Sequence, residues 1–332
     1  MAQPIRWGIL GAGWIAATVA PDIASSDGGV LAAVAARDGA RAAAFAERHG
    51  VERSYGSYRE LVEDPDVDVI YVATTHAQHH EHALLALAAG KPVLVEKAFA
   101  LNAGQAREMV AAARTRGLFC MEAMWMRFNP LILEAQRLVA GGRIGELVNI
   151  RADYSKRFAF SADHRLFDLS AGGGALLDLG VYPLTFAWLF LGRPDTVQAA
   201  GVLSPTGSDA SVAVQWFYDS GRVAQIHTSA ERESPVGALV VGTTGWIAID
   251  TPLHLPASMT IHTADGDEVR TAVLPGNGYG LEVAEVHRCL RQGELESPAV
   301  PLDDTLAILE TIDDVRRQIG VRYPADEPTD GQ

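Results

Sequence analysis

The chain contains 332 residues, enough for about two domains of ~150 residues each, so a single small domain is excluded. Hydrophobic residues make up 48 % and charged residues 20 %, which is the composition of a folded globular protein and not of a disordered or collagen-like one. The formal net charge of −14 would repel nucleic-acid phosphates and anionic lipids, so we expect neither as a partner.

Cysteine content and hydropathy disfavour further classes of protein. The two cysteines, Cys120 and Cys289, form no Cys-x-x-Cys pair, which argues against a disulfide framework and a cysteine-based zinc site. No apolar run approaches the ~18 residues that cross a bilayer, so we expect no membrane partner. Residues Ile5–Ala20 resemble a secretion signal, but cleavage there would remove a glycine motif that follows the first apolar run. A cytoplasmic location fits the sequence best.

About the first 120 residues alternate short apolar runs with helical segments, the pattern of βαβ units around a parallel sheet. The predicted strands are Ile5–Leu10, Val30–Ala35, Val67–Ala73, Pro92–Val95 and Leu118–Met121. The predicted helices are Ile15–Ser25, Ala40–Arg48, Tyr58–Glu63, His80–Ala89 and Ala103–Arg116. Residues 1–123 are therefore predicted to form an α/β domain with a doubly wound parallel sheet.

After about Met124 the pattern changes to β-type runs without intervening helices. These runs are Leu147–Tyr154, Val197–Leu203, Ser211–Tyr218, Arg222–Ser229, Ala238–Ile249, Ser258–Thr263 and Glu268–Val273. Strands that follow one another directly predict a largely antiparallel sheet. Two helical stretches, Gly280–Arg291 and Leu302–Ile319, come last. We predict that residues 124–332 form a second, α+β domain.

A glycine-rich turn lies between the first predicted strand and the first predicted helix. Gly11, Gly13 and Ala16 follow the pattern G-x-G-x-x-A. Gly11 permits a tight turn, Gly13 lets the backbone approach a pyrophosphate, and the small Ala16 lets helix and strand pack closely. The helix start at Trp14 and Ile15 offers backbone N–H groups and a positive dipole to phosphates. The motif predicts a dinucleotide site.

The end of the second predicted strand bears on which dinucleotide is bound. An acidic residue there would bind the ribose 2′-hydroxyl of NAD, whereas an arginine would pair with the 2′-phosphate of NADP. Arg37 lies at this strand end and Arg41 one helical turn further on, which favours NADP. Asp38 leaves NAD open, because NAD would be accepted if Asp38 faced the ribose and Arg41 were only a solvated helix charge.

A second group of residues has the character of a chemical site. Lys97 follows an apolar strand, where it could donate to a substrate oxygen or lower the pKa of a nearby phenol. Asp178 and Tyr182 are four apart in an apolar helical segment that follows three glycines, so they share a helix face. Tyrosine can exchange protons with an alcohol if a cation lowers its pKa from ~10. The competing interpretation is a core tyrosine, a helix charge and a surface lysine.

Together these motifs make the chain resemble the glucose-fructose oxidoreductase, inositol dehydrogenase and MocA (Gfo/Idh/MocA) family over nearly its whole length. The glycine motif, Glu96-Lys97 and Gly-Gly-Gly…Asp178…Tyr182 occur in the family's order and approximate spacing. The segments TTHAQHH, LNA and EAMWMRF at 74–80, 101–103 and 122–128 resemble the branch of dimeric trans-dihydrodiol dehydrogenases and NADP-dependent D-xylose dehydrogenases.

The resemblance implies a Rossmann domain, a C-terminal α/β domain whose open sheet mediates homodimerisation, and a substrate site between them. It implies that Lys97, Asp178 and Tyr182 form the catalytic group for a secondary alcohol or carbonyl of a sugar, polyol or cyclic trans-diol. The hypothesis is that Tyr182 removes the hydroxyl proton as hydride passes to the nicotinamide, while Asp178 orients the substrate. Lys97 would assist Tyr182 or carry the proton itself. The alternatives are a non-catalytic nucleotide-sensing regulator and a keto-sugar reductase of deoxysugar biosynthesis.

The resemblance also assigns roles outside the catalytic group. It places Thr74, His76, His79 and Glu96, together with Lys97, on the cofactor side of the site. Ala98 departs from the family's usual Glu-Lys-Pro and leaves the backbone after Lys97 less constrained.

Two further groups of residues have open interpretations. The histidines at 76, 79 and 80 lie in a predicted loop, but their spacing is poor for zinc, so no metal is expected. Trp125, Arg127 and Phe128 are candidates for a substrate pocket wall, although aromatic residues at this spacing also serve as packing residues.

Overall fold

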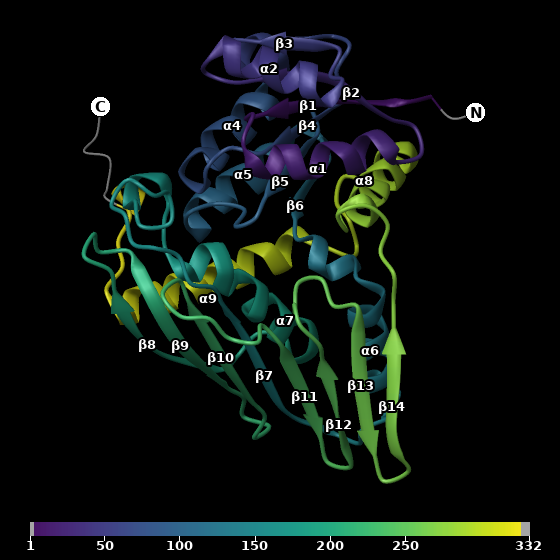
Figure 1. Cartoon of the computed structure of the whole chain (residues 1–332), viewed down its shortest axis with the longest axis vertical. Coiled ribbons are helices and arrows are strands. Elements are labelled where there is room, and N and C mark those ends of the chain that lie inside the picture. The colour runs from purple at the N-terminus through teal and green to yellow at the C-terminus, as the bar shows by residue number, and fades with distance from the viewer. Residues whose placement is uncertain (1–2, 327–332) are drawn as a thin grey trace. The chain divides into compact units, whose positions relative to one another are not determined.

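Two units of structure make up residues 3–326, the part of the chain that the computed structural model describes (Figure 1). Unit 1 comprises Met1–Trp125 and Leu274–Leu306, and unit 2 comprises Met126–Val273 and Ala307–Gln332. The sequence pattern places every residue after 123 in the second domain. The difference is mainly the segment Leu274–Leu306, whose contacts group it with the N-terminal part of the chain.

Unit 1 is built on a six-stranded sheet in the order β3-β2-β1-β4-β5-β6, with every neighbouring pair parallel. Its strands are β1 (Ile5–Leu10), β2 (Gly29–Ala35), β3 (Arg53–Tyr55), β4 (Val69–Val72), β5 (Val93–Glu96) and β6 (Cys120–Ala123). This is the strand order of a dinucleotide-binding sheet, so the predicted doubly wound fold is confirmed. Strand β3 was not predicted, because its three partly polar residues give no apolar run.

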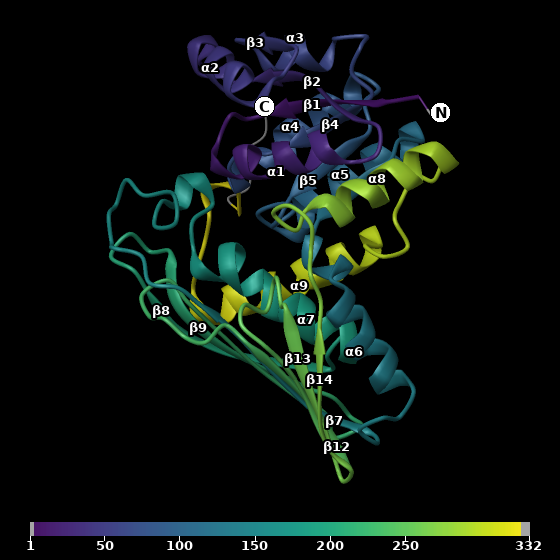
Figure 2. The same ribbon diagram turned by 45° about the vertical axis from the view of Figure 1, so that its right-hand side comes forward.

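The helices of unit 1 occur between these strands and in the returning segment. They are α1 (Trp14–Ser25), α2 (Gly39–His49), α3 (Tyr58–Val62), α4 (His76–Ala88), α5 (Ala103–Arg116) and α8 (Gly280–Gln292). Helices α1 and α8 lie side by side in both ribbon views (Figures 1 and 2). The buried Asp22 carboxylate in α1 accepts the backbone N–H groups of Asn277 and Tyr279. These contacts explain why the segment before α8 returns to unit 1.

Unit 2 is built on an eight-stranded sheet in the order β14-β13-β12-β11-β7-β10-β9-β8. Its strands are β7 (Leu147–Ser155), β8 (Thr196–Leu203), β9 (Asp209–Phe217), β10 (Val223–Ser229), β11 (Ala238–Gly242), β12 (Gly245–Ile249), β13 (Ser258–Thr263) and β14 (Gly266–Thr271). Strands β7 and β10 pair in parallel, and the other neighbours are antiparallel. The predicted mostly antiparallel sheet is confirmed.

The predicted single strand Ala238–Ile249 is wrong, because it folds as the hairpin of β11 and β12. Two glycines next to the turn explain the break. A Cβ atom on Gly242 would lie 2.0 Å from the carbonyl oxygen of Ile144, and one on Gly245 would lie 2.3 Å from that of His262. Both positions therefore need the bare backbone of glycine, which apolar patterning does not reveal.

Helices accompany the strands of this unit: the one at 130–140 was not predicted, whereas the apolar helical segment with Asp178 and Tyr182 and the helix Leu302–Ile319 were. Helix α6 (Pro130–Ala140) begins at a proline, and the Asn129 side chain accepts the backbone N–H of Leu131, a normal helix start. A π-helical turn, Leu176–Gly180, leads into α7 (Val181–Leu191). Helix α9 (Leu302–Ile319) belongs to unit 2 from Ala307 onward.

Figure 2 shows α6, α7 and the unit 2 part of α9 on one face of the eight-stranded sheet. Ile150, Val214 and Ile226 are buried, whereas their strand neighbours Arg151 and Gln225 are exposed, as expected for a sheet with one covered face. Within residues 3–326 no helix covers the opposite face.

The segment Leu169–Leu191 is long and apolar enough to cross a membrane by length and composition. This differs from the expectation that no apolar run approaches ~18 residues. Most of this segment is buried inside unit 2, where α7 packs against β7 and β10. Its apolar character is accounted for by its place in the core.

Candidate active site

The glycine turn after β1 has the shape that a dinucleotide phosphate requires. Gly11 has φ +103°, and a Cβ atom on it would lie 2.7 Å from the carbonyl oxygen of Ala73, so only glycine fits. A Cβ on Gly13 would meet no atom within 4 Å, so open space adjoins the start of α1. Trp14 there is 76 % exposed and Ile15 is half-buried. Backbone N–H groups that face open space at a helix start fit a bound pyrophosphate.

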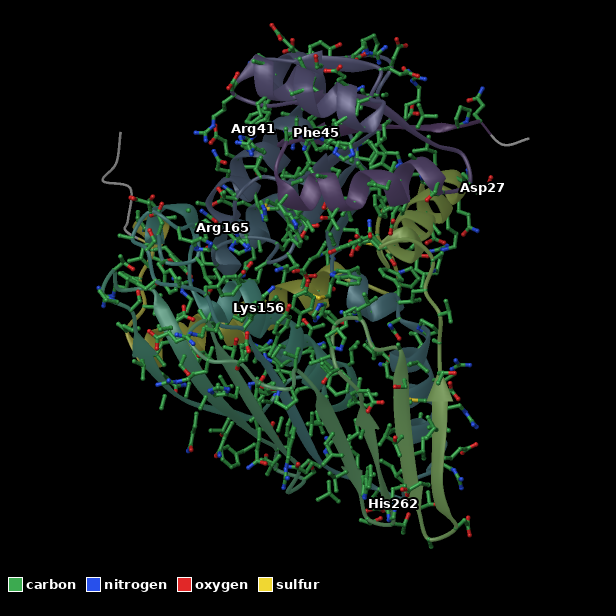
Figure 3. All side chains as sticks on the ribbon, in the orientation of Figure 1. Asp27, Arg41, Phe45, Lys156, Arg165 and His262 are labelled. Carbon is green, nitrogen blue, oxygen red and sulfur yellow. The ribbon has the colours of Figure 1, made fainter. Side chains whose placement is uncertain are left out.

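Arginine side chains lie at the end of β2, as predicted. Arg37 and Arg41 are exposed, and Arg41 Nε donates to the carbonyl oxygen of Ala12, within the glycine turn, at 3.1 Å (Figure 3). Asp38 is the N-cap of α2, and its carboxylate accepts the backbone N–H groups of Ala40 at 2.9 Å and Arg41 at 3.4 Å. The Asp38 side chain is therefore engaged in capping the helix, while both arginines extend from exposed positions.

Tyr58, which the sequence analysis did not single out, adjoins these arginines. Burial raises the pKa of its phenol, and the positive charges of Arg37 and Arg41 oppose that shift. The Tyr58 ring packs edge-on against His82, with ring centroids 4.4 Å apart. No motif marks Tyr58 in the sequence, because it comes from the short helix α3 and meets Arg37 only in the folded sheet.

The residues after β4 form one connected group. The predicted loop is wrong here, because His76 begins helix α4 and the neighbouring histidines lie in its first turns. The methyl group of Thr74 would lie 3.2 Å from a Cβ atom on Gly11, so the turns after β1 and β4 adjoin. Within residues 3–326 no cluster of three or more His, Cys, Asp or Glu side chains could hold a metal ion.

His79 connects this group to the segment after Lys97. Its Nδ1 lies 2.9 Å from the carbonyl oxygen of Ala98, and its Nε2 lies 3.2 Å from that of Thr74. Burial, and to a smaller extent the charge of His76, lower the pKa of the ring to about 3. A neutral ring donates only one hydrogen bond, and the shorter distance favours Ala98 as the acceptor. His79 therefore fixes the backbone next to Lys97.

Lys97 is half-buried directly after β5, and its backbone N–H donates to Glu96 Oε2 at 3.2 Å. The buried Glu96 carboxyl also accepts the phenol proton of Tyr71, which is fully buried on β4. Burial raises the pKa of Glu96 to about 7. The resemblance places Glu96 on the cofactor side, and in the structure its carboxyl binds Tyr71, a partner without a motif.

Other buried groups of unit 1 surround this pair. Glu282 of α8 is fully buried, neither carboxyl oxygen has a hydrogen-bond partner, and its pKa lies well above the usual value because of burial. Glu122 of β6 accepts hydrogen bonds from the backbone N–H of Phe99 and the hydroxyl of Thr305. The ring of Trp125, a predicted pocket residue, stacks on Tyr279 with centroids 4.4 Å apart.

In unit 2, Arg165, which is labelled in Figure 3, pairs with the predicted catalytic carboxylate of Asp178. Arg165 Nη1 lies 3.2 Å from Asp178 Oδ1, and Nη2 lies 3.2 Å from Oδ2. Such a two-point, charge-assisted pair fixes the plane and direction of the carboxylate. Arg165 was not predicted, because it lies in an irregular loop 13 residues before its partner.

Tyr182 is buried on α7, and aromatic rings border it. Its ring centroid lies 5.6 Å from that of Tyr154 and 5.3 Å from that of His254. The rings of Tyr154 and His254 stack in parallel, 4.7 Å apart. Burial and the negative charge of Asp178 raise the pKa of Tyr154 to about 12. Sequence patterning missed both neighbours because they come from β7 and from the loop after β12.

The other predicted pocket residues are Arg127, which is buried, and Phe128, which is half-buried. Both lie in unit 2 at the end of the short helix that begins at Trp125.

Unit 1 thus brings together the predicted cofactor residues and Lys97, and unit 2 brings together Asp178 and Tyr182. The first set suits nucleotide binding, and the second suits proton exchange with a hydroxyl group.

Similarity to known proteins extends over both units. Residues 5–124 match the oxidoreductase family with an NAD-binding Rossmann fold, and residues 132–248 match the Gfo/Idh/MocA C-terminal domain. The chain is 39 % identical over 338 residues to trans-1,2-dihydrobenzene-1,2-diol dehydrogenase of Mus musculus, covering 97 % of this chain and 99 % of the mouse protein. It is 36 % identical over 305 residues to D-xylose 1-dehydrogenase (NADP(+)) of Hypocrea jecorina, covering 82 % and 78 %.

Solved structures agree with this relationship. A 3-ketoreductase from Actinomadura kijaniata, in complex with NADP and TDP-benzene, is similar with a TM-score of 0.86 and 28 % identity, covering 96 % of this chain and 98 % of that one. The glycine turn, the strand order and the matches to both family domains lead to one conclusion. The chain belongs to the Gfo/Idh/MocA family of oxidoreductases, whose N-terminal domain is an NAD-binding Rossmann fold.

Proposed function

We propose that this protein is an NADP-preferring dehydrogenase that acts on a secondary alcohol of a sugar, polyol or cyclic trans-diol, or reduces the matching carbonyl. The observation that carries the proposal is the similarity, over 97 % of the chain, to a dehydrogenase of a cyclic trans-diol. The Hypocrea relative, named for D-xylose and NADP(+), extends the substrate class to aldoses. Both names describe oxidation of a carbon that carries a hydroxyl group.

NADP is favoured over NAD because of the groups at the end of β2. Arg37 and Arg41 supply two exposed guanidinium groups that suit a 2′-phosphate, and Asp38 is engaged as the cap of α2. The glycine turn at 11–13 and the start of α1 would hold the pyrophosphate. When bound, the nicotinamide accepts the hydride from the substrate carbon. Trp14, Ile15, Thr74 and His76 are proposed to complete the cofactor site.

The proposed proton chemistry uses Lys97, Asp178 and Tyr182 on one substrate. Tyr182, as the phenolate, takes the substrate hydroxyl proton on Oη and becomes a neutral phenol, and the Lys97 ammonium stabilises the phenolate before the transfer or shares the proton. Asp178 accepts hydrogen bonds from substrate hydroxyls and thereby orients them. The two hydrogen bonds from Arg165 to Asp178 support the orienting role of Asp178, because a carboxylate can orient a substrate only when its own position is fixed. Trp125, Arg127 and Phe128 are proposed as pocket wall.

The test mixes purified protein with NADP⁺ or NAD⁺ and, separately, with D-xylose, D-glucose and a cyclic trans-1,2-diol. Formation of the reduced nicotinamide is followed by its absorbance, with Tyr182→Phe as the control. Turnover of one substrate class with NADP⁺, lost in Tyr182→Phe, is the expected result. Binding of NADP⁺ without turnover of any substrate would favour a nucleotide-sensing regulator instead.

A second candidate function is reduction of a keto-sugar. The similarity to the Actinomadura 3-ketoreductase, which binds TDP-benzene, favours it. The same site residues would act in the reverse direction, with Tyr182 donating its proton to the carbonyl oxygen. Oxidation of NADPH by a nucleotide-linked keto-sugar, with no oxidation of the free sugars or the diol, would select this candidate.

We further propose that unit 2 forms a homodimer through the open face of its sheet. A shallow cavity of about 440 Å³ on this face is lined by β7, β9, β10 and β11. Arg151 and Asp153 lie on it with opposite charges, so two copies related by a two-fold axis could pair them. Sedimentation equilibrium of the wild type and of Arg151→Glu tests the proposal. A monomeric wild type at micromolar concentration would contradict it.

A further inference from the structure

Asp209, the first residue of β9, contacts the start of the segment that carries Asp178 and Tyr182. We call residues 174–182 the catalytic segment; it runs from Gly174 through the π-helical turn to Tyr182. Asp209 is fully buried, and its Oδ2 accepts the backbone N–H of Leu176 at 2.5 Å. A helix start leaves such N–H groups without partners in its own backbone, so an acceptor here fixes where the turn begins.

The other carboxyl oxygen of Asp209 packs against a glycine of the same segment. Gly174 has φ +139°, and a Cβ atom on it would lie 2.2 Å from Asp209 Oδ1. Oδ1 itself has no hydrogen-bond partner. A buried carboxyl oxygen without a hydrogen-bond partner lowers the stability of the folded state, so Asp209 Oδ1 is destabilising at this point. The carboxyl group and the glycine backbone therefore fit each other closely.

The groups that face this contact also belong to unit 2. Tyr323 is fully buried, and its hydroxyl donates to the carbonyl oxygen of Gly173 at 2.9 Å. The guanidinium of Arg316 lies over the Tyr323 ring, 4.4 Å from its centroid, and pairs with Asp313 and Asp326. Burial raises the pKa of Asp209 to about 6, and the backbone N–H of Leu176 and the charge of Arg316 oppose the shift.

We infer that Asp209 is a positioning residue for Asp178 and Tyr182, because it holds the backbone from which both side chains project. The inference rests on the proposed function, which assigns the chemistry to those two side chains. π-Helical turns are rare, and those that occur are frequently found at functional sites. Asp178 lies within this turn, so the hydrogen bond from Leu176 to Asp209 at its start helps to set the position of the Asp178 side chain. Asp209 touches no reacting group and acts only through the catalytic segment.

The first test compares Asp209→Asn with Asp64→Asn. Asp64 is a buried carboxylate in unit 1 that accepts hydrogen bonds from the backbone N–H of Asp66 and the hydroxyl of Tyr55. Asp64→Asn therefore weakens buried hydrogen bonds as Asp209→Asn does, but away from the catalytic segment. We expect Asp209→Asn to lower kcat by about 10- to 100-fold, the cost of a misplaced catalytic group, with an unchanged KM for NADP⁺. Asp64→Asn should keep kcat even where it lowers the free energy of unfolding.

The pH profile adds a readout that a merely structural role would not change. In the wild type, kcat should fall as the pH drops through about 6, because a protonated Asp209 is a weaker acceptor for Leu176 N–H. Asp209→Asn should lose this acidic limb. An unchanged kcat and an unchanged acidic limb in Asp209→Asn would overturn the inference.

Hydrogen exchange tests the hydrogen bond from Leu176 N–H to Asp209 without any measurement of turnover. It uses the wild type, so it can be made even if Asp209→Asn does not fold. In the wild type, amides 176–182 should exchange faster as the pH is lowered from 7 to 5, after correction for intrinsic exchange, while the Asp66 amide should not. Equal behaviour of both regions would overturn the inference. Failure of the wild type to turn over any substrate would instead count against the proposed function.

Discussion

Arg165 holds both oxygens of the Asp178 carboxylate, with each of the two nitrogen–oxygen distances at 3.2 Å. The Arg165 side chain is 51 % exposed, whereas that of Asp178 is 8 % exposed. Solvent screens the half-exposed Arg165 guanidinium, and ion pairs between exposed side chains typically contribute about 0–1 kcal/mol to stability. Its larger effect is geometric, because a planar guanidinium fixes the plane of the carboxylate that it binds. We therefore expect the pair to affect activity more than folding.

Replacing Arg165 tests this expectation. Arg165→Gln should lower kcat/KM for the substrate by about 10-fold or more, because the carboxylate loses its orientation. Its free energy of unfolding, measured in urea, should change by less than about 1 kcal/mol. Arg157→Gln is the matched control, since Arg157 is an exposed arginine of the same loop. Equal kcat/KM values for the two variants would show that Arg165 does not orient Asp178.

Cofactor preference should depend on the arginines at the end of β2. Arg37→Gln and Arg41→Gln should each lower the ratio of kcat/KM for NADP⁺ to that for NAD⁺ by about 10- to 100-fold, since a charge-assisted hydrogen bond contributes ~1.5–3 kcal/mol. Arg48→Gln, an exposed arginine at the other end of α2, serves as control and should leave the ratio unchanged. Parallel losses with both cofactors would contradict a 2′-phosphate role.

Much of unit 1 could be predicted from the sequence because its signals are local. Apolar runs bounded by helical patterns located five of its six strands, and the glycine motif located the turn after β1. The boundary of α4 was missed because Thr75, its N-cap, makes no side-chain cap hydrogen bond and three histidines follow it. The return of Leu274–Leu306 to unit 1 depends on Asp22, whose partners lie more than 250 residues away.

The candidate site was predictable only as far as its motifs extend. Lys97, Asp178 and Tyr182 were identified by spacing and resemblance, since each lies in or beside an apolar element with a recognisable pattern. Arg165 and Tyr71, by contrast, gain their roles from contacts that no local period encodes. No local period encodes the parallel pairing of β7 with β10 either, because it joins residues far apart in the sequence, such as Ile150 and Ala224.

Tyr182 should be the proton carrier, and its hydroxyl can be removed while its ring stays. Tyr182→Phe should lower kcat by ~10²–10⁴-fold, the usual contribution of a general acid or base. Tyr218→Phe is the control, because Tyr218 is a buried tyrosine of unit 2 whose hydroxyl donates to Gly192 O at 2.8 Å. It should lose about 1 kcal/mol of stability and keep kcat. A loss of less than about tenfold in Tyr182→Phe would point to Lys97 as the proton carrier.

Two glutamates on α8 should affect stability with opposite signs. The pKa of Glu282 is raised far above 4.5 by burial, whereas hydrogen bonds from Arg288 lower the pKa of Glu285 to about 2. A carboxyl with a raised folded-state pKa loses stabilisation as the pH rises above its unfolded value. One with a lowered pKa stabilises above its unfolded value and loses that effect as the pH falls towards 2.

Glu282→Gln should therefore raise the free energy of unfolding relative to the wild type, and the gain should grow as the pH increases from 5 to 8. Glu285→Gln should lower it by about 1–3 kcal/mol at pH 7, and the loss should shrink as the pH falls below 4.5. Urea denaturation at several pH values measures both differences. Because the two residues lie one helical turn apart, a general effect of substitution on α8 would shift both variants in the same direction. A loss of stability in both at pH 7 would mean that the Glu282 carboxylate is stabilised in the folded protein.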